Sequence, residues 1–207
     1  MGAITPAIRH LGLQPYQKIY LQMQSFQAQR NAQTPDEIWL LEHEPVYTLG
    51  RNGKLKHILN SATIPVVHID RGGQVTYHAP GQLIVYTMID LKRAHIGIKQ
   101  WVNHLENTVI RLLGQYEIHA NSDSKAPGVY VNGAKIAAVG LRVSNGRCYH
   151  GLSLNVDMDL SPFEHINPCG YAGLPVTQCK DLGISDSLDD LGNTLVRSLV
   201  AMGENPL

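Results

Sequence analysis

The sequence has no excess of either charge, no long hydrophobic run and only three cysteines. Its 207 residues carry 17 Lys and Arg against 17 Asp and Glu, so no overall field attracts nucleic acid or an anionic membrane. No stretch approaches the roughly 20 apolar residues that a membrane-spanning helix needs. The N-terminal residues lack the basic segment and apolar run of a signal peptide. These absences predict a cytoplasmic protein that binds neither nucleic acid nor membrane.

The cysteines, histidines and glycines argue against disulfide-linked, metal-binding and nucleotide-binding classes of protein. An odd number of widely spaced cysteines argues against a disulfide framework and fits a reducing compartment. The ten histidines are scattered, and none forms a His-Glu-x-x-His or similar metal spacing. The pair Gly72 and Gly73 matches neither a phosphate-binding P-loop nor a dinucleotide fingerprint. We therefore expect no metal, nucleotide or other cofactor.

The apolar fraction of 43% is that of an ordinary globular protein, and the length predicts one domain over residues 1–207. Apolar spacing predicts helices over about 15–30 and 97–113, and a last helix that Ser187 caps. Ser161 to Glu164 has the form of a capping box that opens a short helical turn. Strands are predicted at 37–41, 64–69, 74–78, 83–89, 129–131, 135–143 and 147–156. Since hairpins outnumber parallel crossovers, we expect an α+β fold with a mixed, largely antiparallel central sheet and flanking helices.

Cys169 has the most informative context of the three cysteines. Pro168 and Gly170 flank it, which favours a constrained turn that holds the thiol near the surface. The alternative is a buried structural cysteine, which is common because cysteine packs as a small hydrophobic residue. Cys148 lies within a predicted strand and is expected to be structural. Cys179 lies near Lys180, and a metal pair with Cys169 lacks any Cys-x-x-Cys partner.

Lys135 is the candidate partner of that thiol. It follows the hairpin signal Asn132-Gly133 and precedes a strand of small and apolar residues, so it can border an apolar pocket. A lysine beside a turn is more often solvated. An ammonium next to a thiol favours the thiolate, whereas a partly desolvated lysine can lose its proton and act as a base. Both routes produce a competent nucleophile, and the sequence does not choose between them.

Three glycine-containing runs are candidates for ligand contacts. The segment Asp70–Gln82 is the densest run of polar residues and glycine. Its Arg71 and His78 could contact a phosphopantetheine arm or orient a reacting carbonyl. Gly140 and the run His150–Ser153 could make room for an alkyl chain. Each of these runs also fits ordinary hairpin or strand-end geometry.

Five motifs in order resemble one enzyme family. They are His43–Arg51, Arg71–Gln82, Gly133–Ala137, His150–Val156 and Ile166–Gly170. Together they resemble the lipoyl(octanoyl) transferases of lipoate biosynthesis over about residues 10–185. The resemblance implies a fold similar to the catalytic domains of biotin and lipoate protein ligases. It also implies that no cofactor is needed.

The resemblance implies roles for particular residues. Cys169 would be the acyl-thioester nucleophile and Lys135 its activating partner. Ala138 departs from the serine that many relatives carry, which removes a hydroxyl from the expected pocket. The implied substrate contacts are Arg71, Gly72, Gly73, Gln74, Val75, Thr76, Tyr77, His78, Ala138, Val139, Gly140, Gly151, Leu152 and Ser153.

The implied reaction is an ATP-independent transfer of an octanoyl group. The donor would be octanoyl-acyl carrier protein, and the acceptors would be lysines of apo lipoyl domains, in E2 subunits of 2-oxoacid dehydrogenases and in the glycine cleavage H protein. One alternative is an ATP-dependent lipoate or biotin ligase, which would need no nucleophilic cysteine. Another is a non-catalytic module that binds carrier protein, which would need neither Cys169 nor Lys135.

Overall fold

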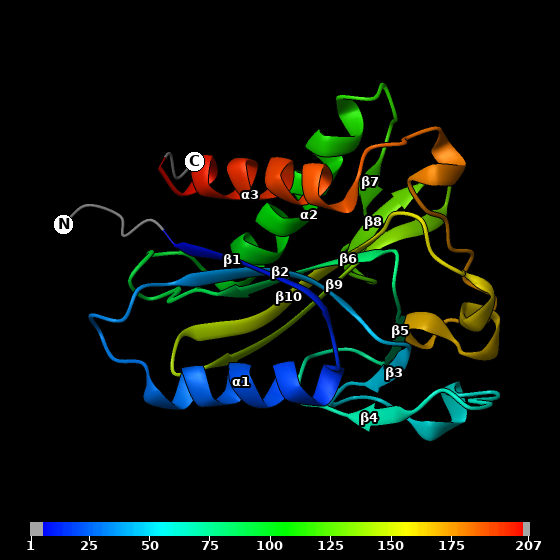
Figure 1. Cartoon of the computed structure of the whole chain (residues 1–207), viewed down its shortest axis with the longest axis horizontal. Coiled ribbons are helices and arrows are strands. Elements are labelled where there is room, and N and C mark those ends of the chain that lie inside the picture. The colour runs from blue at the N-terminus through cyan, green and yellow to red at the C-terminus, as the bar shows by residue number, and fades with distance from the viewer. Residues whose placement is uncertain (1–5, 205–207) are drawn as a thin grey trace.

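Runs of consecutive strands are separated by single α-helices along the computed structural model, which describes residues 6–204 (Figure 1). The α-helices are α1 (Tyr16–Gln29), α2 (Ile98–Gly114) and α3 (Leu188–Glu204). Short 3-10 turns are η1 (Leu55–His57), η2 (Ser161–His165), η3 (Pro168–Gly170) and η4 (Lys180–Leu182). The strands are β1 (Ala7–Gln14), β2 (Glu37–His43), β3 (Val46–Leu49), β4 (Val66–His68), β5 (Val75–His78), β6 (Gln82–Met88), β7 (Asn121–Ser122), β8 (Gly128–Val131), β9 (Ala134–Ser144) and β10 (Arg147–Asn155).

Two sheets organise these elements. The larger has the order β1-β2-β6-β10-β9-β8-β7, and β1 and β2 are its one parallel pair of neighbours within residues 6–204. The smaller has the order β4-β3-β5, in which β3 runs parallel to β4 and antiparallel to β5. The mixed, largely antiparallel α+β fold that the sequence predicted is therefore confirmed.

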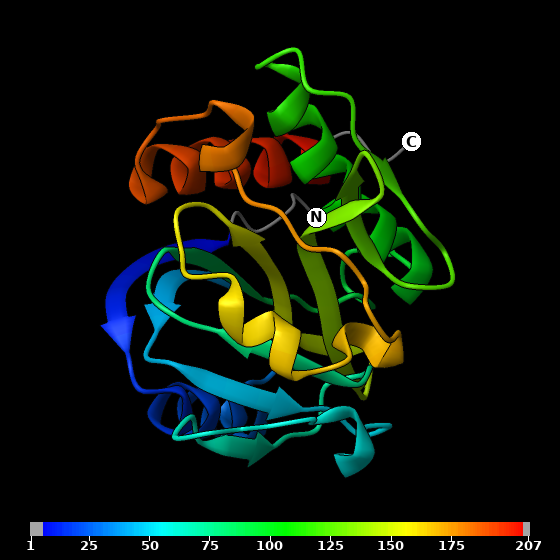
Figure 2. The same cartoon turned by 90° about the vertical axis from the view of Figure 1, so that its right-hand side faces the viewer.

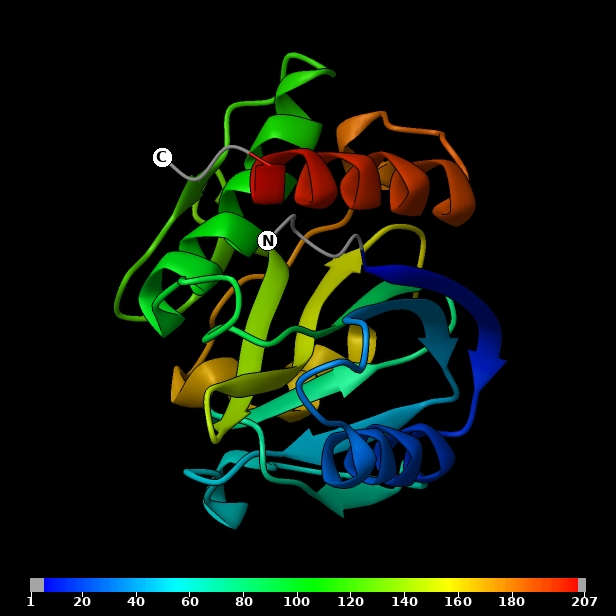
Figure 3. The ribbon, with the colours of Figure 1, turned by 90° about the vertical axis from the view of Figure 1, so that its left-hand side faces the viewer.

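Helices cover both faces of the larger sheet (Figures 1 and 3). Side chains alternate across β2, because successive residues of a strand point to opposite faces. Ile38 and Leu40 join the core beneath α2 and α3, whereas Trp39 and Leu41 pack in the cluster that includes Ile19 of α1. Burial on both faces explains why β2 and β6 are nearly continuous apolar runs.

Two Asn-Gly turns set the register between β8 and β9 and between β9 and β10. Asn132 and Gly133 have φ of 50° and 81°, and Asn145 and Gly146 have φ of 53° and 78°. Tight two-residue hairpins need left-handed backbone at both positions, which asparagine and glycine adopt most readily. The hairpins predicted between β8 and β9 and between β9 and β10 are confirmed.

The structure corrects several local predictions. Strands β1, β3 and β7 were not expected, and β1 lacks a clear apolar alternation because it is an exposed edge strand with a register shift near Gly12. The predicted capping box at Ser161 is wrong. The turn η2 has no side-chain cap, and its Ser161 N–H donates instead to Asp159 Oδ1 at 2.9 Å. None of the helices within residues 6–204 combines the length and apolar character needed to cross a membrane.

Truncating the centre of the larger core should destabilise the protein. Leu105 of α2 is fully buried (0% exposed), so Leu105→Ala removes buried apolar surface and leaves a cavity. We expect a loss of about 2–5 kcal/mol in the free energy of unfolding, measured by urea denaturation. Leu21→Ala is the matched control, because Leu21 is 54% exposed and its truncation should change stability little. Equal effects of the two substitutions would contradict the assigned core.

Candidate active site

Cys169 lies at the tip of the turn η3. Its backbone is left-handed, with φ 57° and ψ 12°, which is uncommon for a residue with a side chain. Bonds on both sides hold this turn: Gly170 N–H donates to Asn167 O at 2.9 Å, and Asn167 N–H donates to His57 O at 2.8 Å. The half-buried thiol thus occupies a constrained turn, as its Pro-Cys-Gly context predicted.

Lys135 reaches that thiol from β9. Its ammonium donates hydrogen bonds to Cys169 Sγ at 2.9 Å and to Pro127 O at 3.0 Å. The same nitrogen lies 5.2 Å from the centroid of the Tyr130 ring, within the range of a cation–π contact. Lys135 is only 4% exposed, so it is not the solvated lysine that its turn position also allowed. The ammonium is therefore placed to stabilise negative charge that develops on the sulfur during a reaction.

Backbone pairing explains why residues 34 positions apart meet. Lys135 N–H donates to Pro175 O at 2.8 Å, and Thr177 N–H donates to Lys135 O at 3.0 Å. The chain downstream of Cys169 therefore pairs with the start of β9 and carries the cysteine turn back over the lysine. Figure 2 shows the turn beside the ends of β9 and the smaller sheet.

The other two cysteines lie outside this arrangement. Cys148 and Cys179 are both fully buried (0% exposed). Burial raises the pKa of each thiol to about 12, so both stay protonated near neutral pH. Within residues 6–204, no cluster of three or more His, Cys, Asp or Glu side chains is arranged to hold a metal ion.

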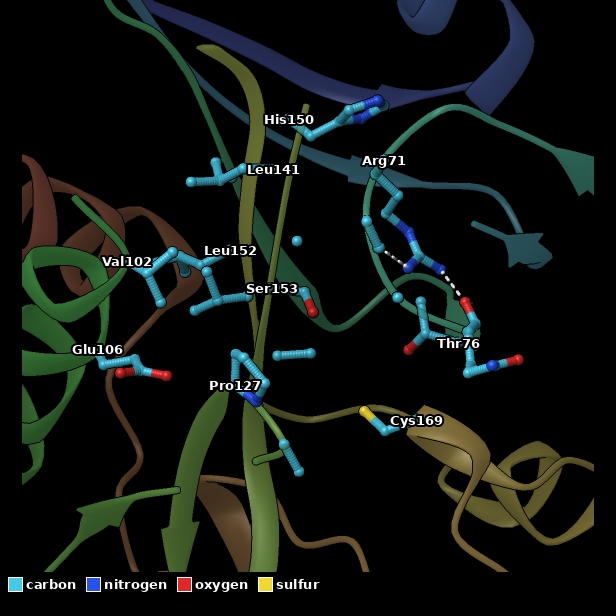
Figure 4. Close-up of a pocket in the computed structure, with 18 of the residues that line it drawn as sticks. Arg71, Thr76, Val102, Glu106, Pro127, Leu141, His150, Leu152, Ser153 and Cys169 are labelled. Carbon is cyan, nitrogen blue, oxygen red and sulfur yellow. Dashed lines mark hydrogen bonds between the residues drawn. The ribbon is translucent and has the colours of Figure 1, made fainter. Parts of the chain in front are cut away.

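A cavity of about 800 Å³ opens beside Cys169 (Figure 4). Its walls include Ile84, Val102, Val139, Leu141 and Leu152, so much of the lining is apolar. The volume falls in the usual range for small-ligand sites. Lys135 lies behind the cysteine and lines a separate cavity of about 20 Å³.

Two of the predicted substrate-contact segments, residues 138–140 and 151–153, lie opposite each other on the neighbouring strands β9 and β10. Gly151 of β10 pairs with Gly140 of β9, and Ser153 pairs with Ala138. A Cβ at Gly151 would lie 2.0 Å from Val85 O, and a Cβ at Gly140 would lie 3.1 Å from Arg71 Cδ. Only glycine fits at position 151, because the Val85 carbonyl belongs to the backbone of the neighbouring strand, whereas a Cβ at position 140 would require the Arg71 side chain to shift slightly.

Arg71 holds its own loop in place through hydrogen bonds to backbone carbonyls. Its guanidinium donates to Thr48 O at 2.8 Å, to Gly72 O at 2.9 Å and to Gln74 O at 2.9 Å. The loop is joined to β9 by a bond of 2.9 Å from Gly72 N–H to Leu141 O. Arg71 therefore shapes the cavity wall through the backbone of residues 71–74.

The buried histidines near the cavity are neutral at neutral pH. Burial, with the nearby His43 and Arg71, lowers the pKa of His78 to about 3, although its bond to Gln82 opposes this shift. Burial likewise lowers the pKa of His43 to about 4. Burial also lowers the pKa of His150, against the opposing effect of Asp70. These rings can orient ligands and neighbours, but they carry no charge into the cavity.

The structure brings nearly all of the predicted site residues to one cavity. Every predicted substrate-contact residue lines it except Tyr77, and Cys169 lies at its edge. The Tyr77 ring instead packs against Tyr47 and Phe163, with ring centroids 5.4 and 5.6 Å apart. The alternation of β5 turns Tyr77 to the opposite face from Thr76 and His78.

Sequence reasoning missed several lining residues, among them Tyr16, Tyr86 and Glu106. The helical spacing of α2 identified Trp101, Leu105 and Val109 as core, but it did not indicate that the flank with Glu106 faces a cavity. The available signal was a carboxylate beside the buried face of an amphipathic helix, where charge is rarely placed without a partner.

Comparison with solved structures identifies the fold. The fold is similar to a bi-partite lipoate protein ligase from Thermoplasma acidophilum, with a TM-score of 0.77, 14% identity and coverage of 96% of this chain and 83% of that one. It is also similar to biotin protein ligase from Aquifex aeolicus, with a TM-score of 0.58, 13% identity and coverage of 96% and 71%. The chain thus has the fold of lipoate and biotin protein ligases.

Sequence comparison then gives the family. The chain belongs to the lipoyl protein ligase A/B catalytic domain family, which matches residues 14–200. An octanoyltransferase from Shewanella sp. (strain ANA-3) is 52% identical over 199 residues, 96% of this chain and 92% of that protein. An octanoyltransferase from Nitrosomonas eutropha is 52% identical over 197 residues, 95% of this chain and 88% of that protein. The resemblance stated from the five motifs is confirmed.

One cysteine should react with an alkylating agent in the folded protein. Near neutral pH, iodoacetamide should modify Cys169 and leave Cys148 and Cys179 free, because burial keeps these two thiols protonated and inaccessible. Intact mass should show a single adduct, and peptide mapping should locate it. Equal labelling of all three cysteines without denaturant would contradict this account, and denatured protein provides the control for full labelling.

Proposed function

We propose that the chain is an octanoyltransferase that moves the acyl group through a thioester on Cys169. The observation that carries this proposal is the 2.9 Å contact of the buried Lys135 ammonium with Cys169 Sγ at the edge of an apolar cavity. Further support comes from relatives named octanoyltransferase over most of the chain. The donor would be octanoyl-acyl carrier protein, and the acceptor would be a lysine of an apo lipoyl domain.

In the first step, the Cys169 thiolate attacks the thioester carbonyl carbon of the donor. A new carbon–sulfur bond forms to Cys169, and the bond to the carrier thiol breaks. The departing thiolate takes a proton from the Lys135 ammonium, which lies against the sulfur. The products are octanoylated Cys169, the free carrier thiol and a neutral Lys135.

In the second step, a neutral lysine amine of the acceptor attacks the enzyme thioester. An amide bond forms, the carbon–sulfur bond to Cys169 breaks, and the amine proton passes to Lys135. The thiolate and the ammonium are thereby restored. Converting a thioester to an amide is downhill, so the cycle needs no ATP.

The cavity suits the acyl chain of such a substrate. Apolar side chains of β9, β10 and α2 would contact the alkyl carbons, whose transfer from water is favourable at roughly 25 cal/mol per Å² of surface. The loop of residues 71–78 and the segments 138–140 and 151–153 would bind the acyl group, with Tyr77 supporting this wall from behind.

The partners and setting follow from the same proposal. Apo lipoyl domains of 2-oxoacid dehydrogenase E2 subunits and the glycine cleavage H protein would be the acceptors. The family and the similar lipoate ligases support a lipoyl-domain partner. We propose that residues 1–207 act as one catalytic domain and that the reaction takes place in the cytoplasm.

Removing the nucleophile should abolish transfer. Cys169→Ala leaves no sulfur to accept the acyl group, so we expect at least a thousandfold loss of transfer to an apo lipoyl domain, roughly the scale for loss of a catalytic nucleophile. Intact mass after incubation with octanoyl-acyl carrier protein should show the octanoyl adduct in the wild type and none in the variant. Cys148→Ala is the control, since it removes a buried thiol that does not line the cavity. Most activity surviving in Cys169→Ala would end the covalent proposal.

Substrate activation distinguishes this reaction from that of an ATP-dependent ligase. Octanoyl-acyl carrier protein should support lipoyl-domain modification without nucleotide, because the thioester already carries the activation. Free octanoate with ATP and Mg²⁺ should give no product above background in the same mass assay. Efficient use of octanoate plus ATP would favour a ligase instead.

A further inference from the structure

Glu106 is a buried acid that the proposed reaction does not use. It is 5% exposed on the third turn of α2 facing the cavity, one turn beyond Val102. Among the lining residues within 6–204 it is the only carboxylate. Buried carboxylates are rare unless a partner satisfies them, so this one calls for a physical reason.

Glu106 binds the same backbone segment that binds the Lys135 ammonium. Glu106 Oε1 accepts a hydrogen bond from Gly128 N–H at 2.8 Å. The carbonyl of the preceding residue, Pro127, accepts a hydrogen bond from the Lys135 ammonium at 3.0 Å. The carbonyl before that, Ala126 O, accepts from Tyr130 Oη at 2.7 Å. We call residues 126–128 the lysine cradle, because each of them has one backbone group fixed.

The lysine cradle lies directly against the lysine side chain. Gly128 has φ 143°, and a Cβ built on it would lie 2.5 Å from Lys135 Cε and 2.4 Å from Ala137 O. No side chain would fit between this backbone and the lysine, so the two lie close together, and the bond from the ammonium to Pro127 O links their positions. Figure 4 shows Pro127 between Glu106 and Cys169.

The electrostatics of Glu106 agree with a partnered group. Burial raises the pKa of its carboxyl, while the Gly128 N–H and the Lys135 ammonium both act to lower it. Asp123, which precedes β8, is the other acid near it. Around the sulfur, the charged and titratable groups are Lys135 of β9, Arg71 of the loop before β5, Tyr130 of β8, and His57 of η1 close to Gly170.

We propose that Glu106 is a positioning residue for Lys135: its hydrogen bond to Gly128 fixes the lysine cradle, so that Pro127 O aims the ammonium at Cys169. This inference rests on the proposed roles of Lys135 and Cys169 and adds the element that sets their geometry. Glu106 acts through the cradle and does not need to touch the substrate. The bond, rather than the charge, carries the effect.

Two substitutions separate the bond from the charge. Glu106→Gln keeps an oxygen at the same reach but removes the charge, whereas Glu106→Asp keeps the charge but withdraws it by one methylene from Gly128 N–H. The readout is the rate of Cys169 alkylation by iodoacetamide as a function of pH, which reports thiolate formation and needs no acyl substrate. Glu117→Gln is the matched control, because it makes the same change at an exposed position just after α2.

We expect Glu106→Gln and Glu117→Gln to stay within about twofold of the wild type. Glu106→Asp should alkylate about tenfold more slowly near neutral pH, with its profile displaced by about one pH unit to higher pH, the scale of one lost hydrogen bond to a charged group. Transfer activity should fall in parallel. Thermal unfolding of each variant shows that the comparison is made on folded protein.

The opposite pattern would overturn the proposal. If Glu106→Asp keeps wild-type reactivity while Glu106→Gln loses it, the charge matters and the bond does not. Unchanged reactivity in both variants, or equal loss in both, would also remove the positioning role. Failure of the proposed function is seen separately, as octanoyl transfer that persists in Cys169→Ala, and it would leave the alkylation result interpretable.

Discussion

The contact between the Lys135 ammonium and the Cys169 sulfur constrains the rest of the site. A buried ammonium is costly unless acceptors surround it, and this one has Pro127 O, the Cys169 sulfur and the face of Tyr130. Because the lysine donates to the sulfur directly, it can stabilise negative charge on that sulfur. Stabilising the cation and activating the nucleophile are therefore one interaction, and the chain after Cys169 pairs with the start of β9 to maintain it.

The cavity shows how the same sheet serves packing and chemistry. Strands β9 and β10 cross its wall in register, with Gly140 opposite Gly151, and the loop held by Arg71 lies close to Gly140. The histidines around this wall are buried and neutral. The positive charge near the thiol thus comes from Lys135 and Arg71, and the negative charge at the wall comes from Glu106.

Local signals in the sequence predicted the local structure well where backbone geometry demands a residue type. The turns at Asn132-Gly133 and Asn145-Gly146 were predicted because few other residues accept left-handed backbone at both positions. The same logic failed at β1, whose exposed edge position imposes no apolar alternation, and at Ser161, where Asp159 binds the backbone instead. Within the candidate site, Tyr77 was included by its place in a contiguous motif, although alternation along β5 turns it away from the cavity.

The sequence by itself determined the family, the Asn-Gly hairpins and the identity of the candidate nucleophile and its lysine, because these depend on residue types in a fixed order along the chain. Only the tertiary structure decided that the lysine is buried, that its ammonium lies 2.9 Å from the sulfur, and that Glu106 of a distant helix holds the intervening backbone. Burial and hydrogen bonding between remote segments arise when the sheet, α2 and the returning chain pack together. No local pattern records that packing.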